Sequence, residues 1–124
     1  MNDDAFGDMR TFPASDRAKK QMKELVSKGL FHEQRDAWRL GAALGIVLNQ
    51  SERKGKRETF QNINSLDPEG IFAAIMIGLY PDITPEERAK KLVDSAEWGI
   101  NQIHHQVEIG TLDWSQLGLL HGQP

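Results

Sequence analysis

The stretch AWRLGAALGIVL, Ala37–Leu48, places Gly41 and Gly45 four residues apart among alanines and larger apolar side chains. The apolar positions recur with helical spacing, which predicts a helix from about residue 33 to residue 48 with a wide apolar face. Each glycine costs an isolated helix roughly 1 kcal/mol relative to alanine. Because this cost needs a compensating gain, we expect close packing against another helix.

The segment before this helix predicts a short strand and a basic helix. Residues 8–15 alternate loosely and contain Pro13, which is typical of an edge strand or an extended arm. Ser15 or Asp16 can cap a following helix that stops at Gly29. One face of this helix is apolar, and the other carries Arg17, Lys19, Lys20 and Lys23.

Two further helices are predicted after the glycine-containing helix. Asp67 is suited to an N-cap and Pro68 to the first helical position, and the run after them is apolar nearly all round, so we expect this helix to be central. Thr84 and Glu87 form the capping box of a last helix that should end near Gly110. The sequence predicts a mainly α, compact four-helix single domain with a short N-terminal strand.

The composition suits one small globular domain. The chain has 124 residues and no cysteine, and its apolar runs are far shorter than the ~20 residues of a membrane span. The first ten residues carry three acids and no apolar run, so we expect no secretory signal and a cytoplasmic protein. Its small core and small-residue helices favour a homodimer. We divide the chain into a disordered N-terminus (1–7), a basic strand-helix-helix half (8–49), a basic connector (50–66), an apolar and acidic helical half (67–110) and a tail (111–124).

Charge is distributed unevenly along the chain. Residues 1–57 hold twelve Lys and Arg against eight Asp and Glu, whereas residues 58–124 hold three against ten, within a net charge of −3. An anionic partner would therefore contact the first half.

The connector sequence QSERKGKRETFQN, residues 50–62, contains Gly55 and Lys56 and is a candidate phosphate-binding loop. A Walker loop needs a glycine five residues before the Gly-Lys pair and Ser or Thr after it. Gln50 and Arg57 occupy these positions. We therefore reject nucleotide hydrolysis here and predict a flexible basic connector, of which 57–63 could be ordered by docking Phe60 and Ile63 onto the core.

The histidines give little support for metal binding or catalysis. His104 and His105 are helix neighbours pointing ~100° apart, so they cannot easily share one ion. His105 with Glu108, or Glu97 with His104, could share a face, but no second helix offers an obvious complement of ligands. The sequence also lacks a nucleophile elbow and a fixed Ser-His-acid pattern. We predict no metal and no cofactor.

The three tryptophans could serve as base-stacking platforms or as packing anchors. Trp38 and Trp98 lie in predicted helices beside small residues, and Trp114 lies in the tail. Because no aromatic cluster interleaves with the basic residues, we favour packing anchors.

The order of elements in residues 8–49 resembles ribbon-helix-helix proteins. A strand-like segment beginning at Arg10, a basic helix, a turn at Gly29 and a second helix follow one another. The resemblance implies that two copies pair their strands into a ribbon that enters the major groove of DNA, while helix N-termini meet phosphates.

A second resemblance covers FHEQRDAWRLGAALGIVLNQSERKGKRETF, Phe31–Phe60. The pair Arg35 and Asp36, the small-residue run AWRLGAALGI and the basic segment after it resemble small accessory proteins of DNA phosphorothioation (Dnd-type) modification and restriction systems. The resemblance implies a DNA-linked prokaryotic defence role and carries over no catalytic residues.

These observations predict a non-enzymatic DNA-binding or DNA-associated accessory protein. The alternative is a protein-interaction subunit of a larger complex without nucleic acid contact, which a pI near 5.8 favours. A third class is a small enzyme using His104, His105 and Glu108. The residues predicted to contact backbone phosphates are Arg10, Lys19, Lys20, Lys23, Arg53, Lys54, Lys56 and Arg57.

Overall fold

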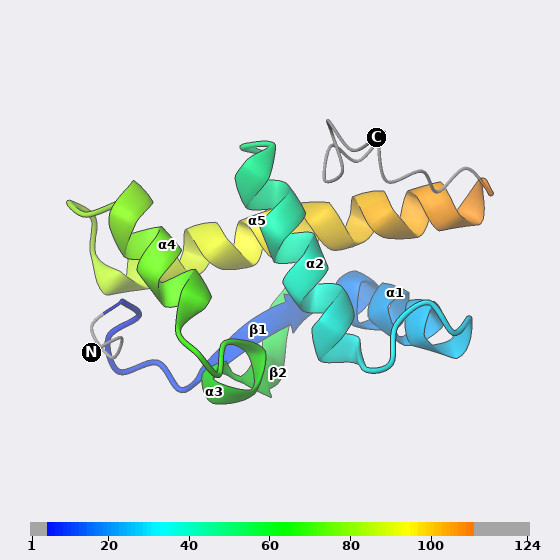
Figure 1. Ribbon diagram of the computed structural model, residues 1–124, viewed down its shortest axis with the longest axis horizontal. Helices are drawn as coiled ribbons and strands as arrows, with labels where there is room; N and C mark the ends of the chain where they lie inside the picture. The colour runs from blue at the N-terminus through cyan, green and yellow to red at the C-terminus, as the bar shows by residue number, and fades with distance from the viewer. Residues whose placement is uncertain (1–4, 111–124) are drawn as a thin grey trace.

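The computed structural model describes residues 5–110, which form two strands and five helices (Figure 1). The predicted mainly helical fold with an N-terminal strand is confirmed, but the helix count was one too low. The additional helix is a single turn in the segment predicted as a connector. In chain order the elements are β1 (Thr11–Ser15), α1 (Asp16–Ser27), α2 (Gln34–Val47), β2 (Arg57–Asn62), α3 (Ile63–Leu66), α4 (Ile71–Leu79) and α5 (Pro85–Glu108).

The long helix α5 lies at the centre of the fold, and α2 crosses it at close range (Figure 1). A Cβ added to Gly41 would lie 2.8 Å from the backbone nitrogen of Ile100, and one added to Gly45 would overlap the carbonyl oxygen of Ser95. A Cβ on Gly99 would overlap the carbonyl oxygen of Gly41. The expected close helix packing is therefore confirmed, with α5 as the partner of α2.

An aromatic cluster joins β1, α2 and α4. The ring of Trp38 stacks on that of Phe12, with centroids 5.7 Å apart, and meets Phe72 edge to face at the same distance. Phe6 meets Phe12 edge to face, with centroids 5.0 Å apart. Trp38 is buried and Trp98 packs against the core, so both act as anchors, as expected. Trp114 lies outside the described residues.

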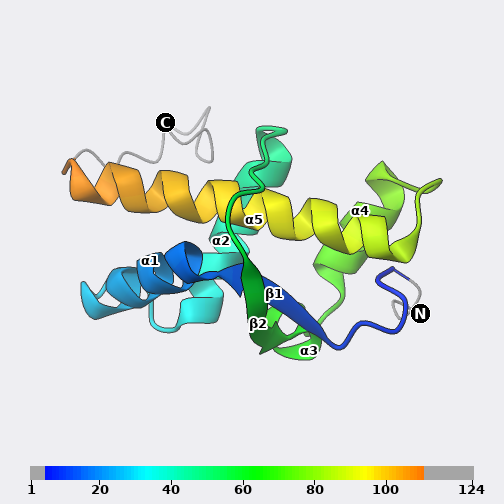
Figure 2. The ribbon, with the colours of Figure 1, turned by 180° about the vertical axis from the view of Figure 1, so that it is seen from behind.

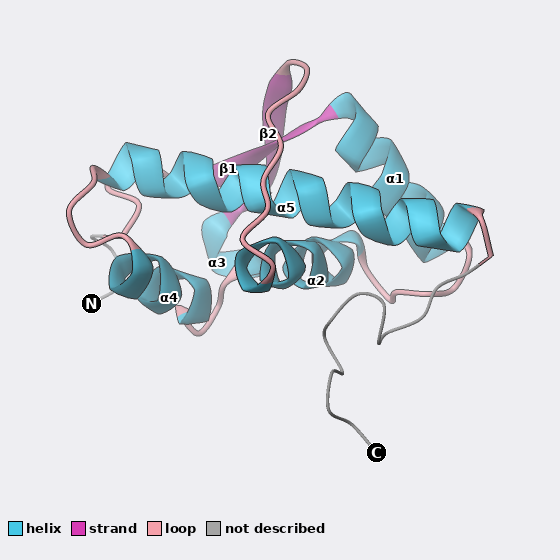
Figure 3. Ribbon diagram, turned by 90° about the horizontal axis from the view of Figure 1, so that it is seen from above, coloured by secondary structure: helices cyan, strands magenta, loops and turns pink. Residues whose placement is uncertain are grey.

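The two strands pair with each other within the chain. β1 and β2 are antiparallel, with Thr11 opposite Asn62 and Ser15 opposite Arg57. Figure 2 shows the paired strands below α5, and Figure 3 shows residues 50–56 crossing α5 between α2 and β2. The predicted connector therefore contains a strand and a helical turn, and Phe60 and Ile63 pack against the core as expected.

Two expectations about α4 were wrong. This helix begins at Ile71 rather than Pro68, because Gly70 adopts a left-handed conformation (φ 70°) that ends a turn. Asp67 nevertheless caps the helix, accepting hydrogen bonds from the amides of Phe72 and Ala73. α4 is also peripheral rather than central, and its outer face leaves Ile71, Ile75 and Leu79 exposed. Within residues 5–110, no helix is both long and apolar enough to cross a bilayer.

Candidate nucleic-acid interface

Three lysines of α1 line one groove. Ser15 caps α1 by accepting a hydrogen bond from the amide of Ala18, and the apolar face with Met22 and Leu25 is buried. This burial fixes the rotation of α1 and directs its basic face outward. A groove of about 710 Å³ opens between α1, the start of α2 and β2. Its lining includes Lys19, Lys20 and Lys23.

β2 supplies the uncharged part of this groove. Thr59, Phe60 and Gln61 line it, and the register of β2 shifts opposite Phe12 and Pro13, where the strand contains one extra residue. A hydroxyl and an amide beside ammonium groups are suitable donors for phosphate oxygens. Phe60 is the one aromatic residue among the described residues of this lining, and it is half-buried because it packs against the core.

Two acidic residues, Asp16 and Glu33, also belong to the groove lining. Asp16 is the first residue of α1, and Glu33 forms a capping box at the start of α2 and an ion pair with Arg35. Both have roles at helix N-termini, where negative charge is favourable. Among the described residues, no carboxylate forms an ion pair with Lys19, Lys20 or Lys23.

Arg53 and Arg57 converge on one carboxylate of α5. Arg53 Nη2 lies 2.8 Å from Asp94 Oδ2, and Arg57 Nη1 lies 2.6 Å from Asp94 Oδ1. Hydrogen bonding to Asp94, with the attraction of its charge, raises the pKa of Arg53 above its ordinary value. The Arg57 side chain is only 12% exposed, whereas that of Arg53 is 57% exposed. Both residues thus fasten the connector to α5.

Glu97 of α5 lies near Arg57 of the connector and contacts the start of α1. Its side chain is 2% exposed and accepts hydrogen bonds from the amide and the hydroxyl of Ser15 at 2.9 and 2.7 Å. Arg57 Nε lies 4.0 Å and Arg17 Nη2 lies 3.7 Å from its oxygens. Arg17 also forms an ion pair with Glu52. These contacts form a largely internal charge network, which no pattern in the sequence predicts.

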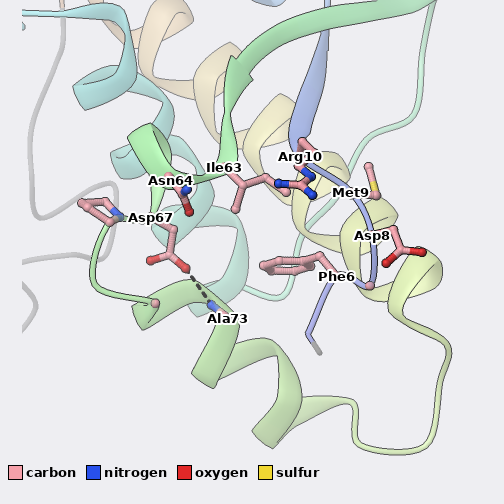
Figure 4. A pocket seen from close by; sticks show the side chains of 11 residues that line it. Phe6, Asp8, Met9, Arg10, Ile63, Asn64, Asp67 and Ala73 are labelled. Atoms are coloured by element: carbon pink, nitrogen blue, oxygen red, sulfur yellow. Dashed lines mark hydrogen bonds between the residues drawn. The ribbon is translucent and has the colours of Figure 1, made fainter. Parts of the chain in front are cut away.

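The remaining predicted residues lie apart from the groove lining. Lys54 and Lys56 are exposed on the connector on either side of Gly55, whose φ of 75° makes a tight turn. Arg10 lies before β1, beside a different pocket of about 740 Å³ (Figure 4). β1 separates Arg10 from the start of α1 by roughly 17 Å. The eight predicted residues therefore divide into three groove lysines, two arginines paired with Asp94, two exposed connector lysines and Arg10.

The structure also assembles a histidine–carboxylate cluster that sequence reasoning missed. His104 Nε2 lies 2.7 Å from Glu24 Oε1 of α1 and 3.4 Å from Glu108 Oε1. His105, which we had considered with Glu108, is exposed and outside the cluster, and Glu97 is committed to Ser15 instead. The i, i+4 spacing of His104 and Glu108 was visible in the sequence, but nothing local indicated that Glu24 would lie opposite.

Comparison with known proteins identifies no relative. No protein-family model matches the chain, and neither a similar curated protein nor a similar solved structure was found.

Proposed function

We propose that this protein binds duplex DNA without catalysis, through contacts between the groove lysines and backbone phosphates. The observation that carries the proposal is the convergence of Lys19, Lys20 and Lys23 on one groove with no ion pair to a described carboxylate. Unpaired ammonium groups on one helix face provide a local positive potential that the net charge of −3 conceals.

The internal charge network changes which basic residues are proposed to contact DNA. Arg57 is nearly buried against Asp94, so its role in the proposal is to hold the connector rather than to bind phosphate. Lys54 and Lys56 are exposed and extend the cationic surface along the connector. Arg10 and Arg53 are secondary contacts, since Arg10 lies elsewhere and Arg53 is paired.

The two family resemblances are consistent with this proposal. The strand, basic helix and second helix occur in the order typical of ribbon-helix-helix proteins, although β1 here pairs with β2 of the same chain. The likeness of residues 31–60 to accessory proteins of Dnd-type DNA modification systems supports a role in prokaryotic defence. In this role the protein would position a partner on DNA.

Salt-dependent binding tests the proposal. Fluorescence anisotropy with a labelled duplex should give an affinity that falls linearly with salt on logarithmic axes, with a slope near −0.9 per neutralised phosphate. If three lysines each contact one phosphate, the affinity for the duplex should fall roughly 40-fold between ~50 and ~200 mM salt. An unlabelled single strand should compete less well than the duplex, since the described lining of the groove holds a single aromatic residue, Phe60, which is half-buried against the core. Absence of binding at ~50 mM salt would exclude the proposal.

The exposed apolar row on α4 favours a second candidate function, which is protein–protein contact with another copy of the chain. Ile71, Ile75 and Leu79 are 56%, 37% and 53% exposed and recur every four residues. α4 has no charged residue, so the same face on two copies can meet without like-charge repulsion. Light scattering should show a dimer that Ile75→Glu dissociates, and a monomeric wild-type protein would exclude this candidate.

A further inference from the structure

We infer that Glu24, His104 and Glu108 form a binding site for a divalent transition-metal ion of the zinc class. One donor atom from each residue lies within 4.8 Å of the other two. The site lies between the last turns of α1 and α5 and does not include the groove lysines. This inference is independent of DNA binding.

A side-chain hydrogen bond one turn earlier sets the alignment of the two helices. Gln21 Nε2 donates to Asn101 Oδ1 at 2.8 Å, and Gln21 is buried. Glu24 and His104 each follow three residues later on their helices, so the same alignment places them opposite one another. A buried contact between the two helices therefore lies directly behind the site.

The separation of the His104 and Glu108 donors suits a small metal ion, and Glu24 lies close enough to join them. A tetrahedral zinc ion with ligands at 2.0–2.2 Å separates its donors by roughly 3.3 Å. His104 Nε2 and Glu108 Oε1 are 3.4 Å apart, and His104 Nε2 and Glu24 Oε1 are 2.7 Å apart. A small rotation of the Glu24 side chain would break its hydrogen bond to His104. Glu24 and His104 could then each bind the ion through one donor atom. The glutamates are 40% and 52% exposed, which leaves space for water as a further ligand.

The electrostatic environment favours a cation. Glu24 lies in the last turn of α1, which has no basic residue, and Glu108 is the last residue of α5. Helix C-termini carry partial negative charge, so two carboxylates there are unfavourably placed unless a cation compensates them. No described lysine or arginine forms an ion pair with either glutamate, and Lys28 at the C-cap of α1 is exposed without one. Imidazole with carboxylates selects zinc-class ions over magnesium or calcium.

Calorimetric titration of the untagged, metal-free full chain with Zn²⁺ tests the inference. We expect saturable binding of one ion per chain and a higher Tm in the presence of zinc, because the ion bridges two helices of the folded state. Bound Co²⁺ should give the intense visible bands of low coordination number. Absence of saturable zinc binding, or the weak spectrum of hexa-aqua cobalt, would overturn the inference.

Matched variants locate the site. His104→Gln and Glu24→Gln should each weaken zinc binding at least tenfold. Glu108→Gln, at an exposed helix end, should do the same with little effect on folding, which circular dichroism verifies. The triple variant His32→Gln, His105→Gln and His121→Gln leaves His104 as the only histidine and should bind zinc as the wild type does. Loss of binding in the triple variant, or full binding in His104→Gln, would refute the assignment.

Discussion

Gly41 of α2 and Gly99 of α5 meet backbone to backbone, with the carbonyl oxygen of Gly41 in the space that a Cβ on Gly99 would need. About one helical turn further along α2, Gly45 makes an equally close approach to the backbone of Ser95. The glycines that weaken α2 as an isolated helix are therefore the residues that let it reach α5. This contact joins the halves of the chain on either side of the connector into one core.

Replacing Gly99 by alanine should lower the free energy of unfolding by about 3 kcal/mol, because the clash is with backbone that cannot rotate away. Urea denaturation measures this change. Gly78→Ala is the matched control, since nothing lies within 4 Å of its Cβ position in α4. There the higher helix propensity of alanine should raise stability by up to about 1 kcal/mol. If the two substitutions changed the free energy of unfolding equally, close packing of α2 on α5 would not be the reason that Gly99 is needed.

Arg53 and Arg57 share Asp94 but should respond differently to substitution by glutamine. Arg57 is nearly buried and also donates to the carbonyl of Glu52, so its loss should leave Asp94 and Glu97 undercompensated and cost roughly 3 kcal/mol. Arg53 is solvent-exposed, so Arg53→Gln should leave the urea midpoint nearly unchanged. If Arg53→Gln lowered the free energy of unfolding more than Arg57→Gln, burial would not explain which of the two ion pairs with Asp94 contributes more to stability.

Glu97→Ala should be among the most destabilising substitutions in the network. It removes two hydrogen bonds to Ser15 at the N-cap of α1 and the most deeply buried carboxylate near Arg17 and Arg57, which then keep only Glu52 and Asp94 as ion-pair partners among the described residues. The expected loss in the free energy of unfolding is about 3–5 kcal/mol. Glu58→Ala on β2 provides the comparison, because Glu58 is exposed and its removal should change stability by less than ~0.5 kcal/mol. Thermal and urea denaturation should agree on this order.

The paired substitutions Lys19→Gln and Lys23→Gln should weaken binding to duplex DNA and reduce the salt slope by about 2, one for each lost phosphate contact. Lys90→Gln with Lys91→Gln removes the same charge from α5, outside the groove lining, and controls for net charge. All four lysines are half-buried or exposed, so folding should be preserved. Equal weakening by both pairs would indicate nonspecific attraction rather than contact in the groove.

The sequence by itself determined the principal helices, because their signals are local. Thr84 caps α5 as predicted, Ser15 is the one of the two candidate residues that caps α1, and the periodicity of residues 33–48 identified α2 within a residue or two. Capping bonds and the 3.6-residue repeat act within about four residues, so they can be read from neighbouring positions. The requirement for close helix packing also followed from two glycines in one apolar run.

Only the tertiary structure decided which strands, helices and charged side chains contact one another. β2, with the polar sequence RETFQN, became a strand because β1 was available to pair with it, and α4 became peripheral although its composition suggested burial. Arg57 opposite Asp94 and Glu24 opposite His104 are 37 and 80 residues apart in the chain. Such pairs depend on how helices align after the core has packed. This alignment separated the basic residues that pair internally from the three lysines that share a groove.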